Sequence, residues 1–367
     1  MIVGIDASRA VKPNRTGPEN YSFDLIRHMI ALDKKNKYIL YAPHLPSDDW
    51  PSAENVRWEI VQGRRLWSQI HLAKHLRVRP PDVLFIPSHV VPLLSKLPTV
   101  VTIHDLAYKY FPSSYRPFER RYLDLTTAVS ATKAKMIITP SKATKQDLVR
   151  EYRVEPDKIT VIPHSYNEEV FNSRRKLPEP PIRGAYFIYV GRIEEKKNLK
   201  LLIDAFAIVA RERNPVSLVL SGKNGYGFEL IQRRIRQLPP KIANQIIQPG
   251  FLPQYDLLRY LKHATGFVFP SWYEGFGLAV LEAMAMGLPV ICSNTSSLPE
   301  VTADAAVLLA PKNPLSWAGA MSRVLNQPNY AKALREKSLK RAEAFSWDRS
   351  AKTTLEVISH AFKTSSS

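Results

Sequence analysis

The chain has 367 residues, enough for two ordinary domains, and its 45% hydrophobic content argues against intrinsic disorder. Its formal net charge of +19 favours anionic partners such as nucleic acid, acidic lipid surfaces or phosphate-bearing small molecules, although a solvated basic surface explains it equally well. The single cysteine, Cys292, excludes an internal disulfide and suits a reducing compartment.

The first residues, MIVGID, read directly as a strand and lack the charged segment, apolar stretch and cleavage site of a secretory signal. No apolar run approaches the roughly 18 residues of a membrane span. We therefore expect a cytoplasmic protein. Basic patches in the N-terminal half, such as residues 116–125, suggest peripheral contact with the acidic inner face of a membrane.

Residues 1–175 alternate short apolar runs with amphipathic segments, which predicts a parallel sheet covered by helices. The first strand is expected over 2–6, and a helix follows over 20–33. The further predicted strands are YILYA (38–42), VRWEIV (56–61), DVLFIP (82–87), TVVTIHD (99–105), MIITPS (136–141) and KITVIP (158–163).

A charged, proline-rich segment at 172–184 interrupts this pattern and predicts a semi-rigid linker. We predict an N-terminal domain over 1–175, a C-terminal domain over 176–345, and a final helix and tail over 346–367. Strands of the second domain are expected in YFIYVG (186–191), SLVLSG (217–222), NQIIQPG (244–250), GFVFPS (266–271), LPVICS (288–293) and AAVLLA (305–310).

Two doubly wound α/β domains joined in this way leave a cleft between the carboxyl ends of their strands, where open parallel sheets bind ligands. In PSWYEGFGLAVLEAMAMGLPVI (270–291), a strand ends in a glycine-bearing loop and a helix is expected from Leu278 to Met286. The free amides at such a helix start, after Gly277, form a phosphate site. Glu274 precedes this turn, and Glu282 lies one helical turn beyond it, where it can accept hydrogen bonds from ribose hydroxyls.

Cationic side chains follow another strand of the second domain. Arg192 and Lys197 come directly after YVG, where a guanidinium fork and an ammonium group suit a diphosphate. The chain contains no Asp-x-Asp pair to hold a metal ion, so protein cations are expected to neutralise that diphosphate. Gly222 and Lys223 end the next strand and can contact the base or a phosphate of the ligand.

In the N-terminal domain, His104 ends a strand, where it can donate a hydrogen bond to a substrate hydroxyl or to developing charge. Gly17 lies in a strand-to-helix turn and is either a ligand contact or a simple turn residue. His71 and His75 have the spacing of a metal pair but no third ligand in view, so we predict no metal site.

Together these segments resemble glycosyltransferase family 4, the retaining GT-B group that includes bacterial mannosyl- and glucosyltransferases. The likeness covers nearly the whole chain, and its most specific part is the Glu274-x7-Glu282 pattern. The segments VGRIEEKKNLKLLIDAF, VVTIHDLAY and SLPEV also match. The resemblance implies an α/β GT-B fold, with two Rossmann-like doubly wound domains facing across a cleft and a last helix returning to the N-terminal domain.

The resemblance also implies that the C-terminal domain binds a nucleotide-sugar donor and the N-terminal domain serves the acceptor. Arg192 and Lys197 then bind the diphosphate, Glu274 contacts the transferred sugar, and Glu282 binds the ribose. The remaining implied contacts are the amides near Phe276, Gly277 and Leu278 with phosphate, His104 with the sugar near its anomeric carbon, and Gly17 with donor phosphate or acceptor.

The chain departs from the family in two places. Where the family often has Thr-Gly-x-Gly-Arg after the first strand, this sequence has TGPEN, which places Glu19 and Asn20 at the last two positions. Where the family often has Pro-Asn-Gly-Val-Asp, this chain has PHSYN at 163–167. Neither difference falls within the donor motifs.

We predict a retaining hexosyltransferase, with mannose favoured, that uses a nucleotide-diphosphate sugar and a glycan or lipid-linked acceptor, without a metal ion or cofactor. Alternatives are another GT-B enzyme, such as a soluble-saccharide synthase or a nucleotide-sugar epimerase, and a silent glycan-binding relative. The net charge also motivates a nucleic-acid-binding protein, but the sequence lacks an aromatic and basic recognition motif, so no nucleic-acid partner is expected.

Overall fold

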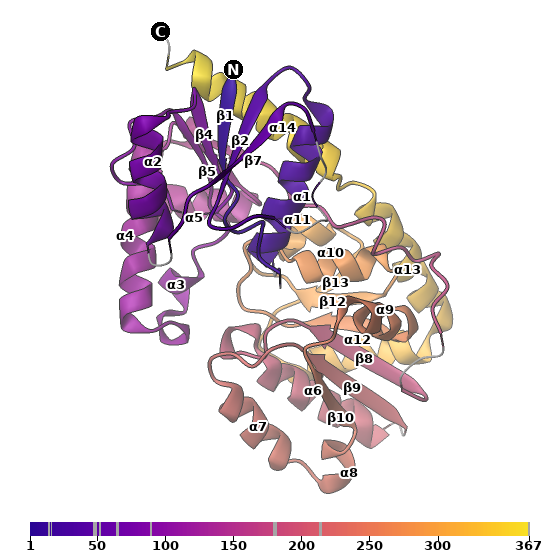
Figure 1. The fold of residues 1–367 in the computed structure, drawn as a ribbon. Helices are drawn as coiled ribbons and strands as arrows, with labels where there is room; N and C mark the ends of the chain where they lie inside the picture. Colours follow the sequence, from indigo (N-terminus) through magenta and orange to yellow (C-terminus); the bar gives the residue numbers. More distant parts are fainter. Residues whose placement is uncertain are drawn as a thin grey trace. The chain divides into compact units, whose positions relative to one another are not determined.

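The computed structural model describes residues 1–13, 15, 17–46, 50, 53–63, 66–88, 90–178, 182–212 and 215–365. The chain forms two compact units (Figure 1). The first comprises Met1–Lys109, Pro117–Ser165 and Ser346–Ser367, and the second comprises Tyr110–Arg116 and Tyr166–Phe345. Residues 179–181 of the predicted linker lie outside the described residues.

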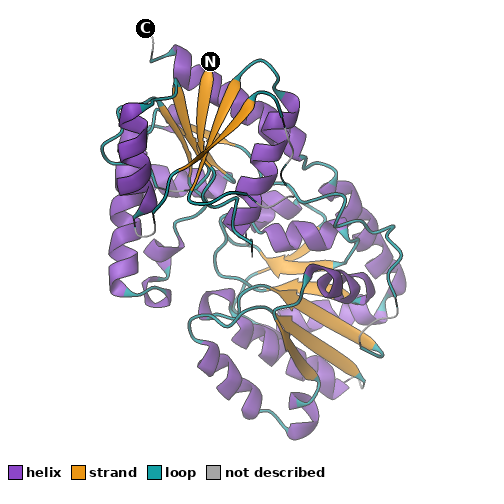
Figure 2. Ribbon diagram, viewed as in Figure 1, coloured by secondary structure: helices purple, strands orange, loops and turns teal. Residues whose placement is uncertain are grey.

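The first unit contains a seven-stranded parallel sheet in the order β3-β2-β1-β4-β5-β6-β7. Figure 2 shows strands of this sheet, in orange, side by side with helices around them. Every strand that the sequence predicts in this half is present, which confirms the alternating pattern. The strands are β1 (Ile2–Asp6), β2 (Lys37–Ala42), β3 (Val56–Ile60), β4 (Val83–Ile86), β5 (Thr99–Thr102), β6 (Met136–Thr139) and β7 (Ile159–Val161).

Helices lie in most of the connections between these parallel strands. The connections from β2 to β3 and from β4 to β5 contain no helix among their described residues. The first helix begins at Gly17, three residues before the predicted start, so Gly17 is helical rather than part of a turn. The helices are α1 (Gly17–Leu32), α2 (Ala73–Val78), α3 (Ala107–Tyr110), α4 (Pro117–Lys133) and α5 (Lys142–Tyr152), with a short π-helix η1 (Ser68–Leu72) before α2.

The last helix, α14 (Trp347–Lys363), belongs to the first unit and packs along α1, as Figure 1 shows. Its buried residues recur at helical spacing, with Trp347, Ala351, Ile358 and Ala361 facing the core of the first sheet. This confirms the prediction of a C-terminal helix that returns to the N-terminal domain.

The second unit contains a six-stranded parallel sheet in the order β10-β9-β8-β11-β12-β13. Its strands are β8 (Ala185–Val190), β9 (Val216–Ser221), β10 (Ile246–Gly250), β11 (Gly266–Phe269), β12 (Val290–Ser293) and β13 (Ala306–Leu309). Its helices are α6 (Leu199–Glu212), α7 (Phe228–Arg236), α8 (Pro240–Ala243), α9 (Gln254–His263), α10 (Leu278–Ala285), α11 (Leu298–Thr302), α12 (Pro314–Asn326) and α13 (Pro328–Ala342).

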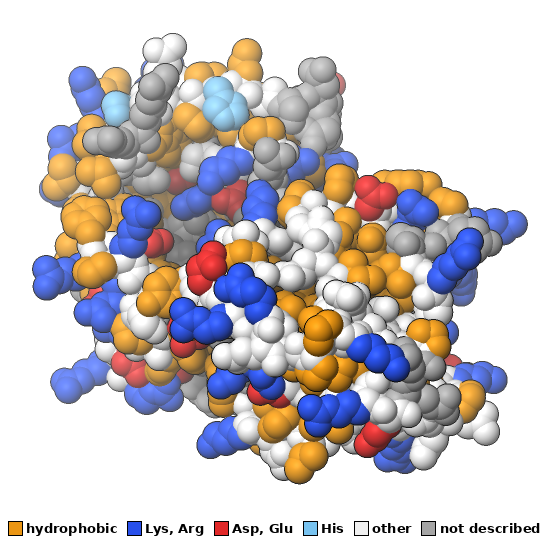
Figure 3. Space-filling model, turned by 90° about the horizontal axis from the view of Figure 1, so that it is seen from below, with side chains coloured by type: hydrophobic (Ala, Val, Ile, Leu, Met, Phe, Trp, Pro, Cys, Tyr) orange, Lys and Arg blue, Asp and Glu red, His pale blue; other side chains and the backbone are white. Residues whose placement is uncertain are grey.

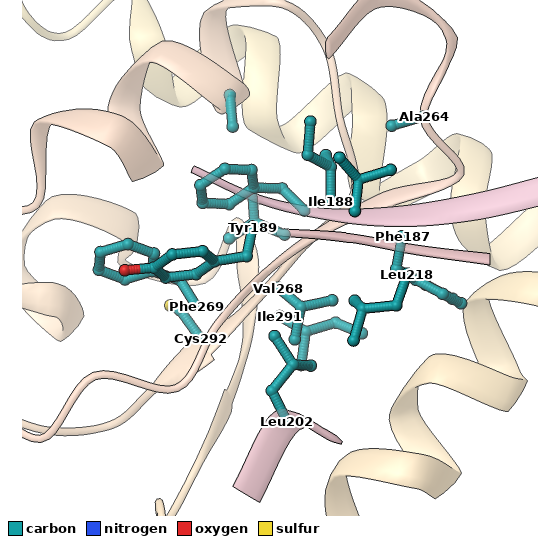
Figure 4. Close-up of a cluster of buried hydrophobic side chains, with 14 of the residues drawn as sticks. Phe187, Ile188, Tyr189, Leu202, Leu218, Ala264, Val268, Phe269, Ile291 and Cys292 are labelled. Carbon is teal, nitrogen blue, oxygen red and sulfur yellow. The ribbon is translucent and has the colours of Figure 1, made fainter. Parts of the chain in front are cut away.

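Both sheets are buried on their two faces, which is why their central strands are almost continuously apolar. All four residues of β4, β11 and β12 are buried. In the second unit, side chains from β8, β9, β11, β12 and α6 meet in one cluster (Figure 4). Cys292 lies within it, and burial raises the pKa of its thiol to about 12, so this cysteine is a packing residue.

The anchoring of α14 is testable by replacing Trp347, which is 5% exposed and lies 5.8 Å from the ring of Tyr21. We expect Trp347→Ala to lower the free energy of unfolding of the first unit by about 3–5 kcal/mol, because it leaves a large cavity. Lys352→Ala, on the exposed side of the same helix, should change it by less than about 0.5 kcal/mol. Urea unfolding curves measure both, and equal stabilities would contradict the packing.

Candidate functional site

The strand order of the second sheet reverses between β8 and β11, because β9 and β10 lie on one side of β8 while β11, β12 and β13 follow on the other. Open α/β sheets bind ligands outside the carboxyl ends of their strands at such a reversal. The two loops that leave this point, 191–198 after β8 and 270–277 after β11, contain most of the predicted donor residues.

The loop after β8 continues its pairing with the segment after β9. Ile193 and Asn224 form a further parallel bridge, and the Ile193 amide donates to the Lys223 carbonyl at 2.9 Å. The two backbones approach so closely at Gly222 that a Cβ there would lie 1.8 Å from the carbonyl oxygen of Gly191. Gly222 also has φ +152°, which L side chains rarely adopt. This glycine therefore allows the two loops to lie together.

Arg192 is exposed, and its backbone is held by the Tyr189 hydroxyl, which donates to its carbonyl at 2.9 Å. The stem of its side chain lies against Gly225, where a Cβ would be 2.8 Å from Arg192 Cγ and Cδ. A larger residue at position 225 would push the guanidinium aside. Lys223 follows on the neighbouring loop, with its ammonium group 4.8 Å from the ring centre of Phe251.

Lys197 and Glu274 join the loops on the two sides of the strand reversal. Lys197 Nζ lies 2.6 Å from Glu274 Oε1, and the two side chains are only 12% and 13% exposed. Lys197 Nζ is also 5.7 Å from the ring centre of Phe269, at the end of β11. Burying a charged group without a partner costs free energy, so a lysine and a glutamate this far removed from solvent are stable only as a pair. Each side chain therefore holds the other in place.

The backbone of the β11 loop is fastened by residues that the sequence analysis did not single out. The Glu274 carbonyl accepts hydrogen bonds from the hydroxyls of Ser296 at 2.5 Å and Ser297 at 2.9 Å. On the other side, the Trp272 amide donates to the Lys196 carbonyl at 3.0 Å. Ser297 opens the SLPEV segment that carries part of the family resemblance, so a signal for it was present in the sequence.

Helix α10 begins at Leu278, as predicted, and Gly277 caps it in the left-handed region with φ +99°. A Cβ on Gly277 would lie 2.6 Å from Leu298 Cδ2. Both the positive φ and the lack of space for a side chain therefore favour glycine at this position. The Leu278 amide precedes the first intrahelical hydrogen bond, which Val280 donates to Gly277. Phe276 is buried against Phe345 at 5.8 Å between ring centres and orients this turn.

Glu282 lies in the second turn of α10, half-buried, on the helix that starts at the glycine turn. Apart from Gly17, which lies in the first unit, the predicted donor residues therefore all lie in the second unit, on loops or helices that follow its strands. These residues are Arg192, Lys197, Gly222, Lys223, Glu274, Phe276, Gly277, Leu278 and Glu282.

His104 belongs to the first unit, follows β5, and is 6% exposed. Its Nε2 lies 2.8 Å from the Pro87 carbonyl, which only accepts, so Nε2 carries a hydrogen. The ring also lies edge-on to Tyr21, 4.8 Å between centres. Donation from Nε2 to a substrate would therefore require breaking the bond to Pro87, which the sequence could not reveal.

A second histidine, His164, packs beside His104 at 5.3 Å between ring centres. Its ring is tilted against Tyr21 at 4.4 Å. Burial, followed by the charge of His104, lowers the pKa of His164 well below its usual value, so its ring is neutral at physiological pH. His164 stands where the family often has asparagine, and this departure was its only signal in the sequence.

The other departure, Glu19, is also structurally defined. Glu19 is 7% exposed in the first turn of α1, and its Oε1 accepts from Arg9 Nη1 at 3.1 Å and from Lys12 Nζ at 3.0 Å. The chain thus places two half-exposed cations after β1, held by a buried carboxylate. Gly17 lies nearby in sequence, and a Cβ there would meet nothing within 4 Å, so backbone geometry does not require glycine.

His71 and His75 do not form a metal pair within the described part of the chain. His75 Nε2 contacts the carboxylate of Glu59 instead. Among the described residues, no three His, Cys, Asp or Glu side chains come together in a way that could hold a metal ion. Nor does any helix of the described ranges have the length and apolar character to cross a membrane.

Basic side chains are spread over the face drawn in Figure 3, where blue groups outnumber red ones without forming a single patch. The basic segment RRIRQL (233–238) lies mostly in α7. Arg233, Arg234 and Arg236 stand in its last turn, where cations are favoured by the helix dipole.

The close approach at Gly222 is testable by substitution. Gly222→Ala should lower the free energy of unfolding of the second unit by about 2–4 kcal/mol, because the Gly191 carbonyl has no side-chain freedom to move away. Gly319→Ala, in α12 with open space around it, should raise that free energy by up to about 1 kcal/mol. Urea unfolding distinguishes the two, and a Gly222→Ala protein as stable as the parent would contradict the geometry.

The Lys197–Glu274 ion pair is testable by a double-mutant cycle with Lys197→Met and Glu274→Gln. We expect a coupling energy of about 1–3 kcal/mol in the free energy of unfolding, because each single substitution leaves a nearly buried charge unpaired. The Lys337–Asp304 pair, exposed by 53% and 83%, is the matched control and should show much weaker coupling because water screens it. Additive effects at Lys197 and Glu274 would show that the pair does not stabilise the two loops.

Comparison with known proteins identifies two family profiles that together span most of the chain. The profile described as "Glycosyl transferases group 1" matches residues 172–341, and "Glycosyltransferase Family 4" matches residues 15–170. The first therefore covers most of the second unit, including the loops after β8 and β11, and the second covers most of the first unit.

Individual proteins agree with these profiles. O-antigen chain mannosyltransferase B of Escherichia coli is 26% identical over 96% of this chain and 98% of its own. O-antigen chain mannosyltransferase RfbU of Salmonella typhimurium is 27% identical over 66% of this chain and 64% of its own.

Among solved structures, Alr3699/HepE of Anabaena in complex with UDP and glucose has a TM-score of 0.74 at 16% identity. It covers 98% of this chain and 99% of its own. This likeness concerns the fold, which is GT-B. The chain belongs to the glycosyltransferases of group 1 and family 4, and it is a transferase enzyme.

Proposed function

We propose that the protein transfers a hexose, with mannose favoured, from a nucleotide-diphosphate sugar to a glycan or lipid-linked acceptor with retention of anomeric configuration. The observation that carries this proposal is the grouping at the strand reversal of the second sheet. Arg192, Lys197 and the amino end of α10 all follow strands that meet there.

The chemistry of such a transfer explains why these groups are needed. Breaking the bond between the sugar and the diphosphate builds negative charge on the leaving nucleoside diphosphate. An exposed guanidinium, an ammonium group and the helix amides near Leu278 are groups that stabilise such charge as it develops. In this proposal protein cations balance the diphosphate, so the reaction proceeds without a metal ion.

The carboxylates have separate roles in the proposal. Glu274 binds hydroxyls of the transferred sugar, with its position set by Lys197 and by the two serines on its carbonyl. Glu282, one turn into α10, binds the ribose. Gly222 and Lys223 border the base or a phosphate, and His104 and Gly17 serve the sugar and acceptor from the first unit.

The choice of donor rests on the relatives. Two mannosyltransferases of O-antigen synthesis match this chain, which supports mannose as the sugar. HepE is described in complex with UDP and glucose, which supports a nucleotide-sugar donor. The O-antigen relatives also support a glycan acceptor. A lipid-linked acceptor and peripheral contact with the cytoplasmic face of the membrane are part of the proposal because of the basic net charge.

The first test is thermal stabilisation by GDP, UDP, ADP and their sugar conjugates, with and without Mg²⁺. A ligand at about 100 times its dissociation constant should add roughly 2.7 kcal/mol of apparent stability. We expect one nucleotide to stand out without a metal requirement. Arg192→Ala should remove that stabilisation and lower turnover about 10²–10³-fold, because the leaving diphosphate loses a cation.

Arg335→Ala, an exposed arginine of α13, is the matched control and should retain both binding and turnover. The anomeric configuration of the product, read by NMR, tests retention. If no nucleotide stabilises the protein, or if Arg192→Ala and Arg335→Ala behave alike, the diphosphate assignment is wrong.

A further inference from the structure

A second cationic site lies in the first unit, at the amino ends of its strands. A cavity of about 660 Å³ opens there, lined in part by Lys96, Lys133, Lys135 and Lys158. Lys96 precedes β5, Lys133 and Lys135 precede β6, and Lys158 precedes β7. Because these three strands are neighbours and parallel, the four lysines gather at one edge of the sheet. That edge is opposite to the carboxyl ends where His104 lies.

None of these four lysines forms an ion pair with a carboxylate of the described residues. Their hydrogen bonds go to backbone carbonyls instead. Lys135 Nζ donates to Thr364 at 3.0 Å, Lys158 Nζ donates to Ala131 at 2.8 Å, and Lys133 donates to Leu93. Four like charges therefore surround one cavity without a compensating anion from the described chain.

An ordinary explanation accounts for part of this arrangement. Lys158 also reaches the Thr132 carbonyl at 2.9 Å, so it satisfies the carboxyl end of α4, as lysines often do. That role does not explain Lys96, which has no hydrogen bond to the described residues, or Lys135, which reaches the segment after α14. Each ammonium group has three donors, so a single carbonyl bond leaves donors for a ligand.

We propose that this cavity is a binding site for a phosphate-bearing anion, separate from the donor site. Lysine binds phosphate as a point charge, and several ammonium groups can share the oxygens of one phosphate or diphosphate. Burial and then the charge of Lys135 lower the pKa of Lys158, which agrees with their closeness. An anion between them would relieve this repulsion.

Such a phosphate can belong to a soluble molecule or to a lipid headgroup, and the same lysines would recognise either. Leu93 and Leu94, exposed by 42% and 62%, stand shortly before Lys96 in the chain. Both sources therefore need their own arm in the experiment. The inference does not depend on the proposed transfer reaction, because it uses no residue of the donor site.

The soluble arm uses inorganic pyrophosphate and the full chain. Acetylation of lysines with and without pyrophosphate, read by mass spectrometry, reports each site separately from the donor loops. We expect pyrophosphate to protect Lys96, Lys133 and Lys135 in the parent protein. Lys96→Gln/Lys135→Gln should weaken pyrophosphate binding at this site about tenfold, the loss expected for charged hydrogen bonds.

The lipid arm compares binding to vesicles of phosphatidylcholine alone and of phosphatidylcholine with phosphatidylglycerol. Lys34→Gln/Lys35→Gln is the matched control for both arms, because it removes the same charge from exposed lysines of the same unit. Lys34 also donates to a helix carbonyl, that of Ile30, at 3.0 Å. The control variant Lys34→Gln/Lys35→Gln should bind pyrophosphate and the vesicles as the parent protein does, within about twofold.

If Lys96→Gln/Lys135→Gln, the cavity variant, alone loses pyrophosphate affinity and the protection of Lys133, the site is assigned to a soluble anion. Loss of binding to the acidic vesicles in that variant alone would assign it to a lipid headgroup. If pyrophosphate does not protect these lysines and the protein does not bind the acidic vesicles more tightly than those of phosphatidylcholine alone, the proposal is overturned. The same holds if the cavity variant and the control change equally, since charge alone would then explain the binding.

Discussion

The reversal of strand order between β8 and β11 is the constraint on which the proposed donor site depends. On each side of this point, the chain moves from one strand to the neighbouring strand in a single direction, from β8 through β9 to β10 and from β11 through β12 to β13. Here the chain leaves β8 and β11 in two loops towards opposite sides, which is where open α/β sheets bind their ligands. Arg192, Lys197, Glu274 and the start of α10 lie on these two loops because of that topology.

Two close interactions keep these loops in place. On the β9 side, the absence of a side chain at Gly222 lets the backbone pass the Gly191 carbonyl. On the β11 side, Lys197 and Glu274 pair across the reversal, and Ser296 and Ser297 hold the Glu274 carbonyl. These contacts hold the backbone of both loops, and groups held in place in this way are what the stabilisation of developing charge requires in the proposed reaction.

The first unit separates two kinds of polar site on opposite edges of one sheet. At the carboxyl edge, His104 is enclosed by Tyr21 and His164, and α14 adds Trp347 to the same aromatic group. At the amino edge, the lysines that precede β5, β6 and β7 are exposed or half-buried around a cavity. Through Trp347, the last helix therefore contributes to the surroundings of His104 at the carboxyl edge of this sheet.

The sequence by itself determined the two parallel α/β units, their strands, the start of α10 and the family. These follow from local hydrophobic periodicity and from short motifs such as Glu274-x7-Glu282, which need no knowledge of distant contacts. Only the tertiary structure decided the partners of these residues. The bond from His104 to Pro87, the ion pair of Lys197 with Glu274 and the gathering of four lysines join residues from separate segments of the chain. Which segments meet depends on the order of the strands in each sheet, which a local pattern of residues does not specify.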